Sequence, residues 1–244
     1  MAFLSDRLKA VAEMITPGLP VADIGCDHAY LPIYLIREDR APYVIACDVS
    51  AGPIMRAQEN VEDVDLGERI DVRQGDGLSV ISPGEVKAVV LAGMGGKLMM
   101  RILEEGADAL EGVSELIMEP QSEVAAVRHF LQDNGFRIIS ENMISEEGKF
   151  YPVIKAVPGS MDWDKEIYFR YGKILLREEN PVLHEFLLVE RKYCSDLLKE
   201  LSENEDIPHV FVRMEEVKTD LALNADALQL VSEPGLFEDI RELS

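Results

Sequence analysis

The sequence has few of the residues that build disulfide frameworks and metal centres. Its 244 residues include only 3 cysteines and 4 histidines, and both kinds are scattered along the chain. Widely spaced cysteines in odd number do not suggest a disulfide framework, and isolated histidines do not suggest a zinc site. We therefore expect reduced thiols, no bound metal and a cytoplasmic location.

Long apolar runs are also missing. No stretch reaches the roughly 20 apolar residues that a membrane-spanning helix needs, and the first residues lack the pattern of a signal peptide. The sequence therefore predicts no membrane segment. With 47% hydrophobic residues the chain can still form a packed core, as one large domain or as one domain with a smaller appendage.

Positive charge is scarce as well. The chain has 24 lysines and arginines against 46 acidic residues, a net charge of −22. This balance argues against a large nonspecific nucleic-acid surface. A local basic strip can still bind phosphates, because charges act mainly within a Debye length of about 8 Å. Its candidate members are Arg7, Lys9, Arg37, Arg40, Lys97, Arg101, Arg128, Arg170, Lys173 and Arg177.

The hydrophobic pattern of the first two thirds alternates between strands and helices. An amphipathic helix is expected at 4–15, with Ser5 as its N-cap. Continuous apolar strands indicate a parallel sheet covered on both faces, and Glu146-Glu147-Gly148 predicts a closing hairpin. These features predict an α/β, Rossmann-like, doubly wound sheet with one antiparallel strand. Strands are expected at 20–25, 43–48, 69–74, 86–92, 114–119, 136–144 and 150–157, and helices at 30–38, 51–63, 97–105 and 122–134, the last starting at Ser122.

Pro158-Gly159-Ser160 marks a boundary between two expected domains, 1–158 and 161–244. In the second, Asn180-Pro181 predicts a helix start. Two apolar series joined by a polar turn at 204–206 predict an antiparallel coiled-coil hairpin, although helices lying flat on the sheet remain an alternative. The series are Leu183, Phe186, Leu187, Cys194, Leu197 and Leu201, broken by Glu190, and then Ile207, Val210, Met214, Val217, Leu221 and Leu228.

The first strand ends in an acid and a glycine and turns directly into a helix. Asp23, Gly25 and Cys26 form this turn, whose backbone N–H groups can approach a bound nucleotide closely. Asp48 ends the next strand, with Val49 beside it, and an acid there is placed to bind the hydroxyls of a ribose. The sequence therefore predicts a cofactor that contains a nucleoside.

The same turn favours one cofactor over another. A dinucleotide fold uses Gly-x-Gly-x-x-Gly, whereas Asp27 and Tyr30 occupy the second and third glycine positions here. A carboxylate at position 27 would repel a pyrophosphate, but it tolerates a sulfonium and an amino group. The turn thus favours S-adenosyl-L-methionine over NAD.

Three further loops follow neighbouring strands. Gly75-Asp76-Gly77 can meet an adenine amine and fold against its flat ring, although an ordinary turn has the same composition. The glycines of Ala92-Gly93-Met94-Gly95-Gly96 predict close approach of a cofactor or substrate to the backbone. In Glu119-Pro120-Gln121, Gln121 can read a base edge and Glu119 can accept a hydrogen bond; a plain strand end is equally open.

Several segments occur together in one order: Asp-Ile-Gly-Cys-Asp-His-Ala-Tyr-Leu-Pro at 23–32, Asp-Val-Ser-Ala-Gly-Pro at 48–53, Gly-Asp-Gly-Leu at 75–78, Ala-Gly-Met-Gly-Gly at 92–96, Glu-Pro-Gln at 119–121 and Gly-Lys-Phe-Tyr at 148–151. This combination resembles the bacterial tRNA (adenine(22)-N(1))-methyltransferases over about residues 3–160. The resemblance implies a class I S-adenosylmethionine-dependent fold and N1 of a tRNA adenine as methyl acceptor. The helical hairpin also fits this family, as a tRNA-binding domain.

With this resemblance, the motifs receive expected roles. Asp27, His28 and Tyr30 are the expected catalytic residues: Asp27 stabilises the cationic product base and Tyr30 stacks on the flipped adenine, while His28 is equally well a packing residue. Adenine N1 has an available lone pair, so positioning and electrostatics suffice without a base. We expect a monomer that binds tRNA. Cofactor contacts are expected from Asp23, Gly25, Cys26, Asp48, Val49, Asp76, Gly77, Ala92, Gly93 and Met94, and substrate contacts from Gly95, Gly96, Lys97, Arg101 and Gln121.

Three other functions stay open from the residues alone. The first is methyl transfer to another RNA or to a small molecule. The second is an NAD-dependent oxidoreductase, against which the missing glycines argue. The third is a catalytically silent binding module, against which the retained acids Asp23, Asp48 and Asp76 argue.

Overall fold

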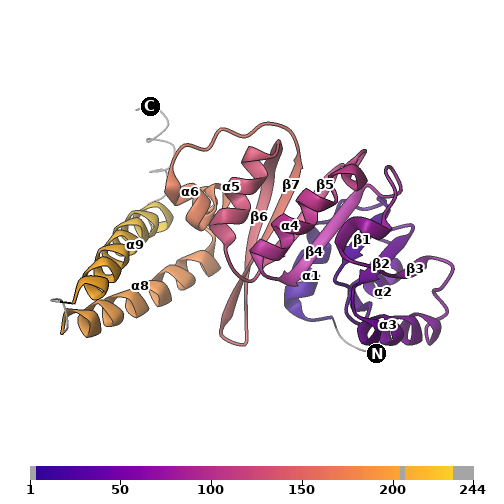
Figure 1. Ribbon diagram of the computed structural model, residues 1–244, viewed down its shortest axis with the longest axis horizontal. Helices are drawn as coiled ribbons and strands as arrows, with labels where there is room; N and C mark the ends of the chain where they lie inside the picture. Colours follow the sequence, from indigo (N-terminus) through magenta and orange to yellow (C-terminus); the bar gives the residue numbers. More distant parts are fainter. Residues whose placement is uncertain (1–3, 204–206, 233–244) are drawn as a thin grey trace. The chain divides into compact units, whose positions relative to one another are not determined.

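The computed structural model describes residues 4–203 and 207–232 (Figure 1). The chain divides into two compact units, residues 1–163 and residues 164–244. The first unit is built around one sheet, and the described part of the second is helical. Each unit has its own buried side chains.

The sheet of the first unit has seven strands in the order β3-β2-β1-β4-β5-β7-β6. Strands β1 to β5 pair in parallel, and β7 runs antiparallel to both of its neighbours. Glu147 and Gly148 join β6 to β7 with φ of 51° and 75°, as a two-residue hairpin turn requires. The predicted doubly wound sheet is confirmed. Its strands are β1 (Val21–Ile24), β2 (Val44–Asp48), β3 (Ile70–Gln74), β4 (Ala88–Met94), β5 (Glu115–Pro120), β6 (Phe136–Glu146) and β7 (Lys149–Pro158).

Helices cover both faces of this sheet. They are α1 (Asp6–Met14), α2 (Tyr30–Arg37), α3 (Ala51–Glu62), α4 (Gly96–Glu105) and α5 (Val124–Asp133), with short 3₁₀ turns η1 (Gly77–Val80) and η2 (Ala107–Leu110). Ser5 caps α1 as predicted, because its Oγ accepts the Leu8 N–H. The predicted start of α5 at Ser122 is wrong. Glu123 precedes the helix at φ 49°, and the Ser122 carbonyl accepts the Gly96 N–H instead.

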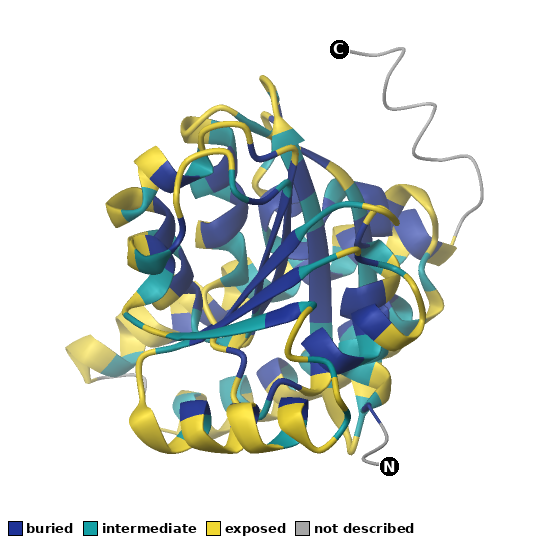
Figure 2. Cartoon of the chain, turned by 90° about the vertical axis from the view of Figure 1, so that its right-hand side faces the viewer, coloured by how far each residue is buried: buried dark blue, intermediate teal, exposed yellow. Residues whose placement is uncertain are grey.

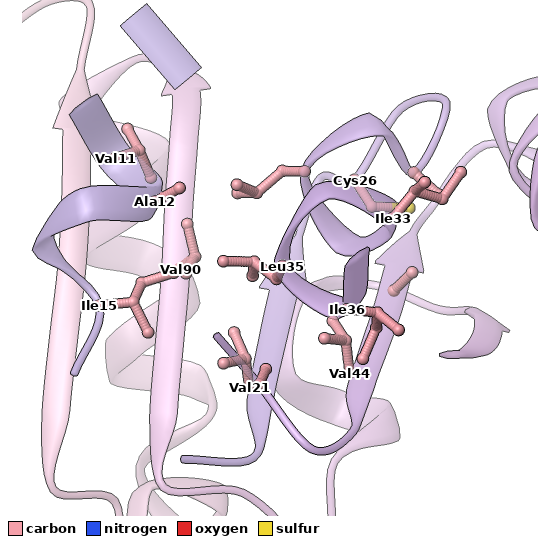
Figure 3. Close-up of a cluster of buried hydrophobic side chains, with 14 of the residues drawn as sticks. Val11, Ala12, Ile15, Val21, Cys26, Ile33, Leu35, Ile36, Val44 and Val90 are labelled. Atoms are coloured by element: carbon pink, nitrogen blue, oxygen red, sulfur yellow. The ribbon is translucent and has the colours of Figure 1, made fainter. Parts of the chain in front are cut away.

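A hydrophobic core lies between the sheet and helices α1, α2 and α3. Figure 2 shows central strands in dark blue and helices whose outer faces are yellow. In Figure 3, Ile15, the residue after α1, lies beside Val90 of β4, while Leu35 and Ile36 of α2 lie near Val21 and Val44. Burying each such side chain contributes about 1.5–3 kcal/mol. This packing fixes the relative positions of the strands whose carboxyl ends form the site.

Helix α1 is also fastened at both ends by polar groups. The Glu146 carboxylate accepts the Asp6 N–H at 2.9 Å, which caps the first turn of the helix. Just beyond its last turn, Thr16 donates its N–H and hydroxyl to Glu115, at 2.7 and 2.6 Å. Lys155 of β7 pairs with Glu115 at 2.9 Å and donates to the carbonyl of Met14 at 2.8 Å. These contacts set the position of Arg7 in the first turn.

In the second unit, α6 (Glu166–Tyr171), α7 (Lys173–Arg177), α8 (Pro181–Ser202) and α9 (Pro208–Ser232) follow one another. Asn180 caps α8 as predicted, with its Oδ1 accepting two N–H groups at 3.0 Å. Helices α8 and α9 pack against each other as a hairpin. The predicted turn at 204–206 lies outside the described residues. The buried side chains of the pair include Leu183, Leu187, Cys194, Met214, Val217 and Ala227.

A buried polar group explains why Glu190 interrupts the apolar series. Asn224 of α9 is 1% exposed and donates to Glu190 of α8 at 3.0 Å and to the Leu187 carbonyl at 2.9 Å. Glu190 also accepts from Tyr171 at 2.7 Å and from Arg170 at 3.0 Å. A carboxylate and an amide thus replace an apolar pair at one level of the hairpin, which fixes its register.

Candidate functional site

A cavity of about 360 Å³ lies at the carboxyl ends of β1, β2, β3 and β4. This is the edge where the strand order reverses between β1 and β4, the usual ligand site of a doubly wound sheet. Its volume suits a small-molecule ligand, since such pockets span about 300–1,000 Å³. The predicted cofactor residues that line it are Gly25, Asp48, Val49, Asp76, Gly77, Ala92, Gly93 and Met94, joined by the predicted substrate residue Arg101.

The turn after β1 is bent tightly toward the cavity. Gly25 has φ 82°, and a Cβ there would lie 2.9 Å from the Met94 side chain. Asp27 and Ala29 also adopt the left-handed region, with φ of 48° and 60°. Such conformations cost roughly 1–2 kcal/mol for residues other than glycine. Strain of this kind gathers at functional sites, and here it shapes the start of α2.

Two carboxylates stand at different places on the cavity wall. Asp48 ends β2, and its Oδ1 accepts the Ser50 N–H at 2.8 Å, which holds the side chain at the strand tip. Asp76 lies in the loop after β3 and pairs with Arg101 of α4 at 3.6 Å. A nucleoside between them would meet one acceptor near its ribose and another near its base.

Two cysteines lie beneath the turns. The Cys47 thiol donates to the carbonyls of Gly75 and Gly77, and burial raises the pKa of Cys47 to about 11. Burial likewise raises the pKa of the Cys26 thiol. Both thiols are therefore protonated at neutral pH and act as packing and hydrogen-bonding groups, not as nucleophiles.

Asp23 is buried at the end of β1, with 4% of its surface exposed. Loss of hydration, and to a smaller extent the neighbouring Asp48 charge, raise the pKa of its carboxyl to about 7. An acid in this state takes up a proton near neutral pH unless a cation is bound beside it.

A second, smaller cavity of about 170 Å³ shares Gly25, Ala92 and Gly93 with the first. Asp23, Cys26, Asp27 and Tyr30 also line it, together with Arg7 of α1. The three predicted catalytic residues are neighbours here. His28 stacks on Tyr30 with ring centroids 5.4 Å apart, and its Nε2 lies 3.3 Å from Asp27 Oδ1. Their catalytic roles remain predictions.

The chain resembles known methyltransferases over most of its length. Residues 4–154 match the family model described as a methyltransferase domain. The tRNA (adenine(22)-N(1))-methyltransferase of Bacillus subtilis is 36% identical, over 94% of this chain and 96% of that protein. The chain belongs to the tRNA (adenine(22)-N(1))-methyltransferase family.

Solved structures agree with this membership. The Bacillus subtilis tRNA methyltransferase TrmK matches with a TM-score of 0.86 at 34% identity, covering 93% of this chain and 100% of that one. A Streptococcus pneumoniae relative, solved in complex with S-adenosyl-L-methionine, matches with a TM-score of 0.84 at 33% identity and the same coverage. Family membership therefore removes the NAD-dependent oxidoreductase from the alternatives.

The cavities of this methyltransferase fit S-adenosylmethionine by their chemistry. The larger one is lined by the carboxylates of Asp48 and Asp76, and Val49, 59% exposed, offers apolar surface beside them. The smaller one has charged groups of both signs, Arg7 against Asp23 and Asp27. When bound, the cofactor supplies an electrophilic methyl group.

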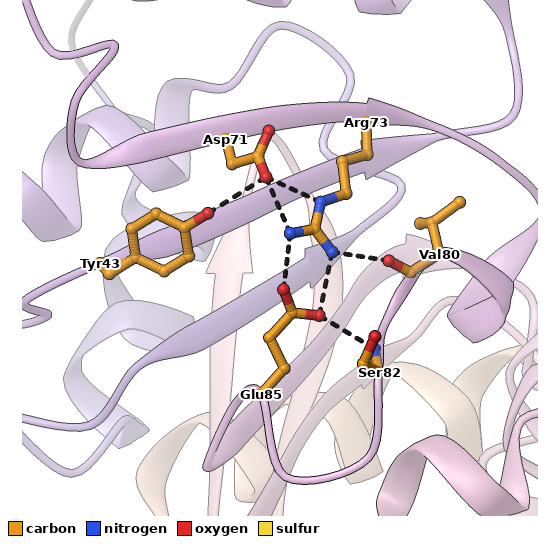
Figure 4. Close-up of polar contacts among 6 residues, drawn as sticks. All are labelled: Tyr43, Asp71, Arg73, Val80, Ser82 and Glu85. Carbon is orange, nitrogen blue, oxygen red and sulfur yellow. Dashed lines mark hydrogen bonds and ion pairs between the residues drawn. The ribbon is translucent and has the colours of Figure 1, made fainter.

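An arginine network behind the site was missed by the sequence interpretation. Arg73 of β3 donates to Glu85, to Asp71 and to the carbonyl of Val80, at 2.6, 2.8 and 2.7 Å respectively (Figure 4). Hydrogen bonding to Glu85 is the main cause that raises the pKa of Arg73. The network ties the end of β3 to the chain after η1, and so it fixes the loop that carries Asp76. The sequence did contain a signal for this network, because Arg73 stands in a strand directly before a glycine-rich loop.

The other predicted substrate residues differ in how far they are exposed. Lys97 and Gln121 are exposed, and the Gln121 N–H bonds the Met94 carbonyl at 3.0 Å. Gly96 is buried, and a Cβ there would lie 2.6 Å from the Ser122 carbonyl oxygen. Packing between the starts of α4 and α5 is enough to explain this glycine, and its role as a substrate contact stays a prediction. Gly95 is half-buried, and a Cβ there would lie 3.0 Å from Ser122 Oγ.

The expected basic strip is also wrong for several of its members. Arg128 is 1% exposed and donates to Glu141 at 2.8 Å, and Arg40 donates to carbonyls at the end of α1. Arg170 is paired with Glu190 and Asp220, and Gly172 at φ 90° separates it from α7, so no continuous helical stripe exists there. Arg128 and Arg170 thus neutralise acids within their own units, and Arg40 satisfies backbone carbonyls.

Among residues 4–203 and 207–232, no helix is long and apolar enough to cross a membrane. The same part of the chain contains no cluster of three or more histidine, cysteine, aspartate or glutamate side chains suited to hold a metal ion.

Proposed function

We propose that this protein transfers the methyl group of S-adenosyl-L-methionine to N1 of adenine 22 in tRNA. The observation that carries the proposal is the cavity at the switch point of the sheet, with Asp48 and Asp76 on its wall, in a chain of this family. The acceptor position in the RNA follows from the Bacillus subtilis relative, which bears that name.

In this proposal the larger cavity holds the adenosine of the cofactor. Asp48 accepts hydrogen bonds from the ribose, because its carboxylate is fixed at the tip of β2 by the Ser50 N–H. Asp76 accepts from the adenine amine, and Gly77 at φ 56° lets the chain lie flat against the ring. Arg101 holds Asp76 in this orientation through their ion pair.

The acceptor adenine lies at the rim formed by Asp27, His28 and Tyr30. Tyr30 is 41% exposed and already stacked on His28, so a flipped base can extend the same stack. Methylation of N1 leaves the base with a positive charge, and the Asp27 carboxylate lies where it can stabilise that charge. Attack by the N1 lone pair needs no proton transfer, so these residues act by positioning and by charge.

Residues 164–244 supply the tRNA-binding domain and residues 1–158 the cofactor-binding domain, with 159–163 continuing the first unit. Lys97 is 82% exposed at the start of α4, so it is placed to meet phosphates near the rim. We also infer that the protein acts as a monomer in the cytoplasm. Light scattering after size exclusion tests the monomer.

The test incubates the protein with labelled S-adenosylmethionine and unmodified tRNA and then maps the methylated base. The proposal expects one 1-methyladenine, at position 22. An Asp48→Ala variant serves as the cofactor control, and a tRNA with guanine at that position as the acceptor control. Methylation of another base or RNA would leave the cofactor assignment standing and overturn the acceptor. Absence of cofactor binding would overturn both.

A further inference from the structure

A third cavity, of about 550 Å³, lies between α1, α2 and the end of α3 and shares no lining residue with the adenosine cavity. Its volume is within the range of about 300–1,000 Å³ that small-molecule sites span. Tyr30 lines this third cavity and also the smaller cavity beside the turn after β1. The third cavity therefore adjoins the rim where the acceptor adenine is proposed to lie, although no step of methyl transfer requires it.

One face of α2 forms a wall of the third cavity. Four residues at the spacing i, i+3, i+4 and i+7, which places them on one side of the helix, line it: Tyr30, Ile33, Tyr34 and Arg37. Ile33 is buried and Tyr34 is half-buried, so this wall presents an aromatic ring beside apolar surface. An unstacked RNA base binds such a ring through its flat face, whatever the identity of the base.

Arg37 supplies a positive charge that the fold does not use. Its side chain is exposed, and in the part of the chain that the structure describes it has no hydrogen-bond or ion-pair partner. Arg7, by contrast, donates through Nη1 to Glu119, and Lys9, which also lines the third cavity, pairs with Asp6 at 2.8 Å. A free guanidinium can donate two parallel hydrogen bonds to one phosphate. Beside an aromatic wall, it suits a ligand that has both a phosphate and a flat ring.

Asn60 of α3 connects the third cavity to the turn that carries the proposed catalytic residues. Its Nδ2 donates to the carbonyl of His28 at 2.9 Å, between Asp27 and Ala29, the two residues in the left-handed region. Its Oδ1 accepts no hydrogen bond from the described residues, so it can accept one from an amino group on a base. Occupation of the third cavity is thus one hydrogen bond away from the rim.

We propose that the third cavity binds the nucleotide next to the acceptor adenine, with its base against Tyr34 and its phosphate at Arg37. The inference deepens the proposed function and rests on it, because it assigns a second part of the same RNA. When the acceptor base leaves its stack, the neighbouring base loses a stacking partner, and a site beyond Tyr30 can replace that partner. Glu38 and Asp63 also line the cavity, and their charges favour a single phosphate over a run of phosphates.

The experiment measures kcat/KM for methyl transfer to three tRNAs. One is complete, and the other two carry an abasic site on the 5′ side or on the 3′ side of adenine 22. The variants are Tyr34→Leu, Tyr34→Phe and Arg37→Gln. Arg56→Gln is the matched control for Arg37→Gln, because Arg56 is exposed on α3, has no hydrogen-bond or ion-pair partner among the described residues and lines none of the three cavities. Calorimetry with S-adenosylhomocysteine monitors the cofactor site.

The proposal expects Tyr34→Leu to lower kcat/KM on the complete tRNA by about 5- to 150-fold, the range that loss of base stacking on an aromatic ring gives. On one of the two abasic tRNAs this loss should disappear, because the base that Tyr34 contacts is already missing. Tyr34→Phe keeps the ring and should retain activity. Arg37→Gln should reduce the slope of log KM against log salt by about 0.7–0.9, the value for one phosphate contact, and Arg56→Gln should not. Affinity for S-adenosylhomocysteine should stay as in the wild type for all four variants.

Full activity of Tyr34→Leu, or an equal loss on all three tRNAs, would overturn the inference, and the equal loss would assign the cavity to a distant part of the tRNA. Equal salt slopes for Arg37→Gln and Arg56→Gln would overturn it as well, and this comparison stands even if Tyr34→Leu does not fold. A wild type that binds S-adenosylhomocysteine but methylates no tRNA would instead refute the proposed function.

Discussion

Replacing Asp23 by asparagine should make the free energy of unfolding of the ligand-free protein less dependent on pH. The same change should weaken the affinity of the protein for the cofactor. The carboxyl of Asp23 is buried, and its pKa is raised to about 7 from an ordinary 3.8. At pH values between these two, the folded protein therefore holds a proton on Asp23 that the unfolded chain has already released. Its contribution to stability is complete below the lower value and is lost as pH rises through the higher one.

The size of this effect follows from the shift. One pKa unit corresponds to about 1.4 kcal/mol, so a shift of this size removes on the order of 4 kcal/mol from the free energy of unfolding by pH 8. Asparagine at this position does not titrate, and the variant should lack the slope. The difference in unfolding free energy between variant and wild type should therefore grow by about 1.4 kcal/mol per pH unit between the two pKa values of Asp23.

Denaturant unfolding at several pH values between about 5 and 8 measures the difference. Trp163 is the single tryptophan, is 8% exposed and belongs to the first unit, so its fluorescence reports the unit that contains Asp23. Asp39→Asn is the matched control, because the Asp39 side chain is 94% exposed. Parallel pH curves for wild type and Asp23→Asn would refute the reasoning, since Asp23 would then titrate as an ordinary surface acid.

Further predictions concern the other positions of the site. Asp48→Ala should lose about 1.5–3 kcal/mol of cofactor binding, measured by calorimetry, with an unchanged melting temperature; an equal affinity would remove the ribose assignment. Asp27→Asn should lower kcat much more than cofactor affinity, and equal losses would reduce Asp27 to a cofactor contact. Gly96→Ala should destabilise the fold by about 1–3 kcal/mol in denaturant unfolding. The control Gly52→Ala should not, because a Cβ at that position in α3 would meet no atom within 4 Å. Similar losses for the two variants would contradict the packing argument. Deleting 164–244 should leave cofactor binding intact and abolish tRNA methylation, and full activity would show that these residues are dispensable.

The positions of the strands along the chain, and the ends of those strands, could be predicted from the sequence because both depend on local pattern. Continuous apolar runs such as 88–92 mark buried parallel strands, and parallel strands bring their carboxyl ends to one edge. Asp48 and Asp76 therefore line one cavity although they belong to different strands. The apolar series of α8 and α9 predicted the hairpin in the same way.

Contacts between distant segments could not be read in this way. Arg7 and Glu119 are 112 residues apart, and no periodicity links them. From the sequence, Arg128 looks like an ordinary surface charge. The structure shows instead that it is buried in an ion pair with Glu141. For Gly96, a glycine required by close packing and a glycine required by a ligand look the same in sequence. Three-dimensional neighbours, not residue type, decide such cases.

The fastening of α1 has a consequence for how the protein is made. This helix is translated well before the groups that hold its two ends, which are Glu115, Glu146 and Lys155. Arg7 can therefore take its place only after β7 has emerged. During synthesis the nascent chain can form the adenosine loops early, yet it completes the smaller cavity last.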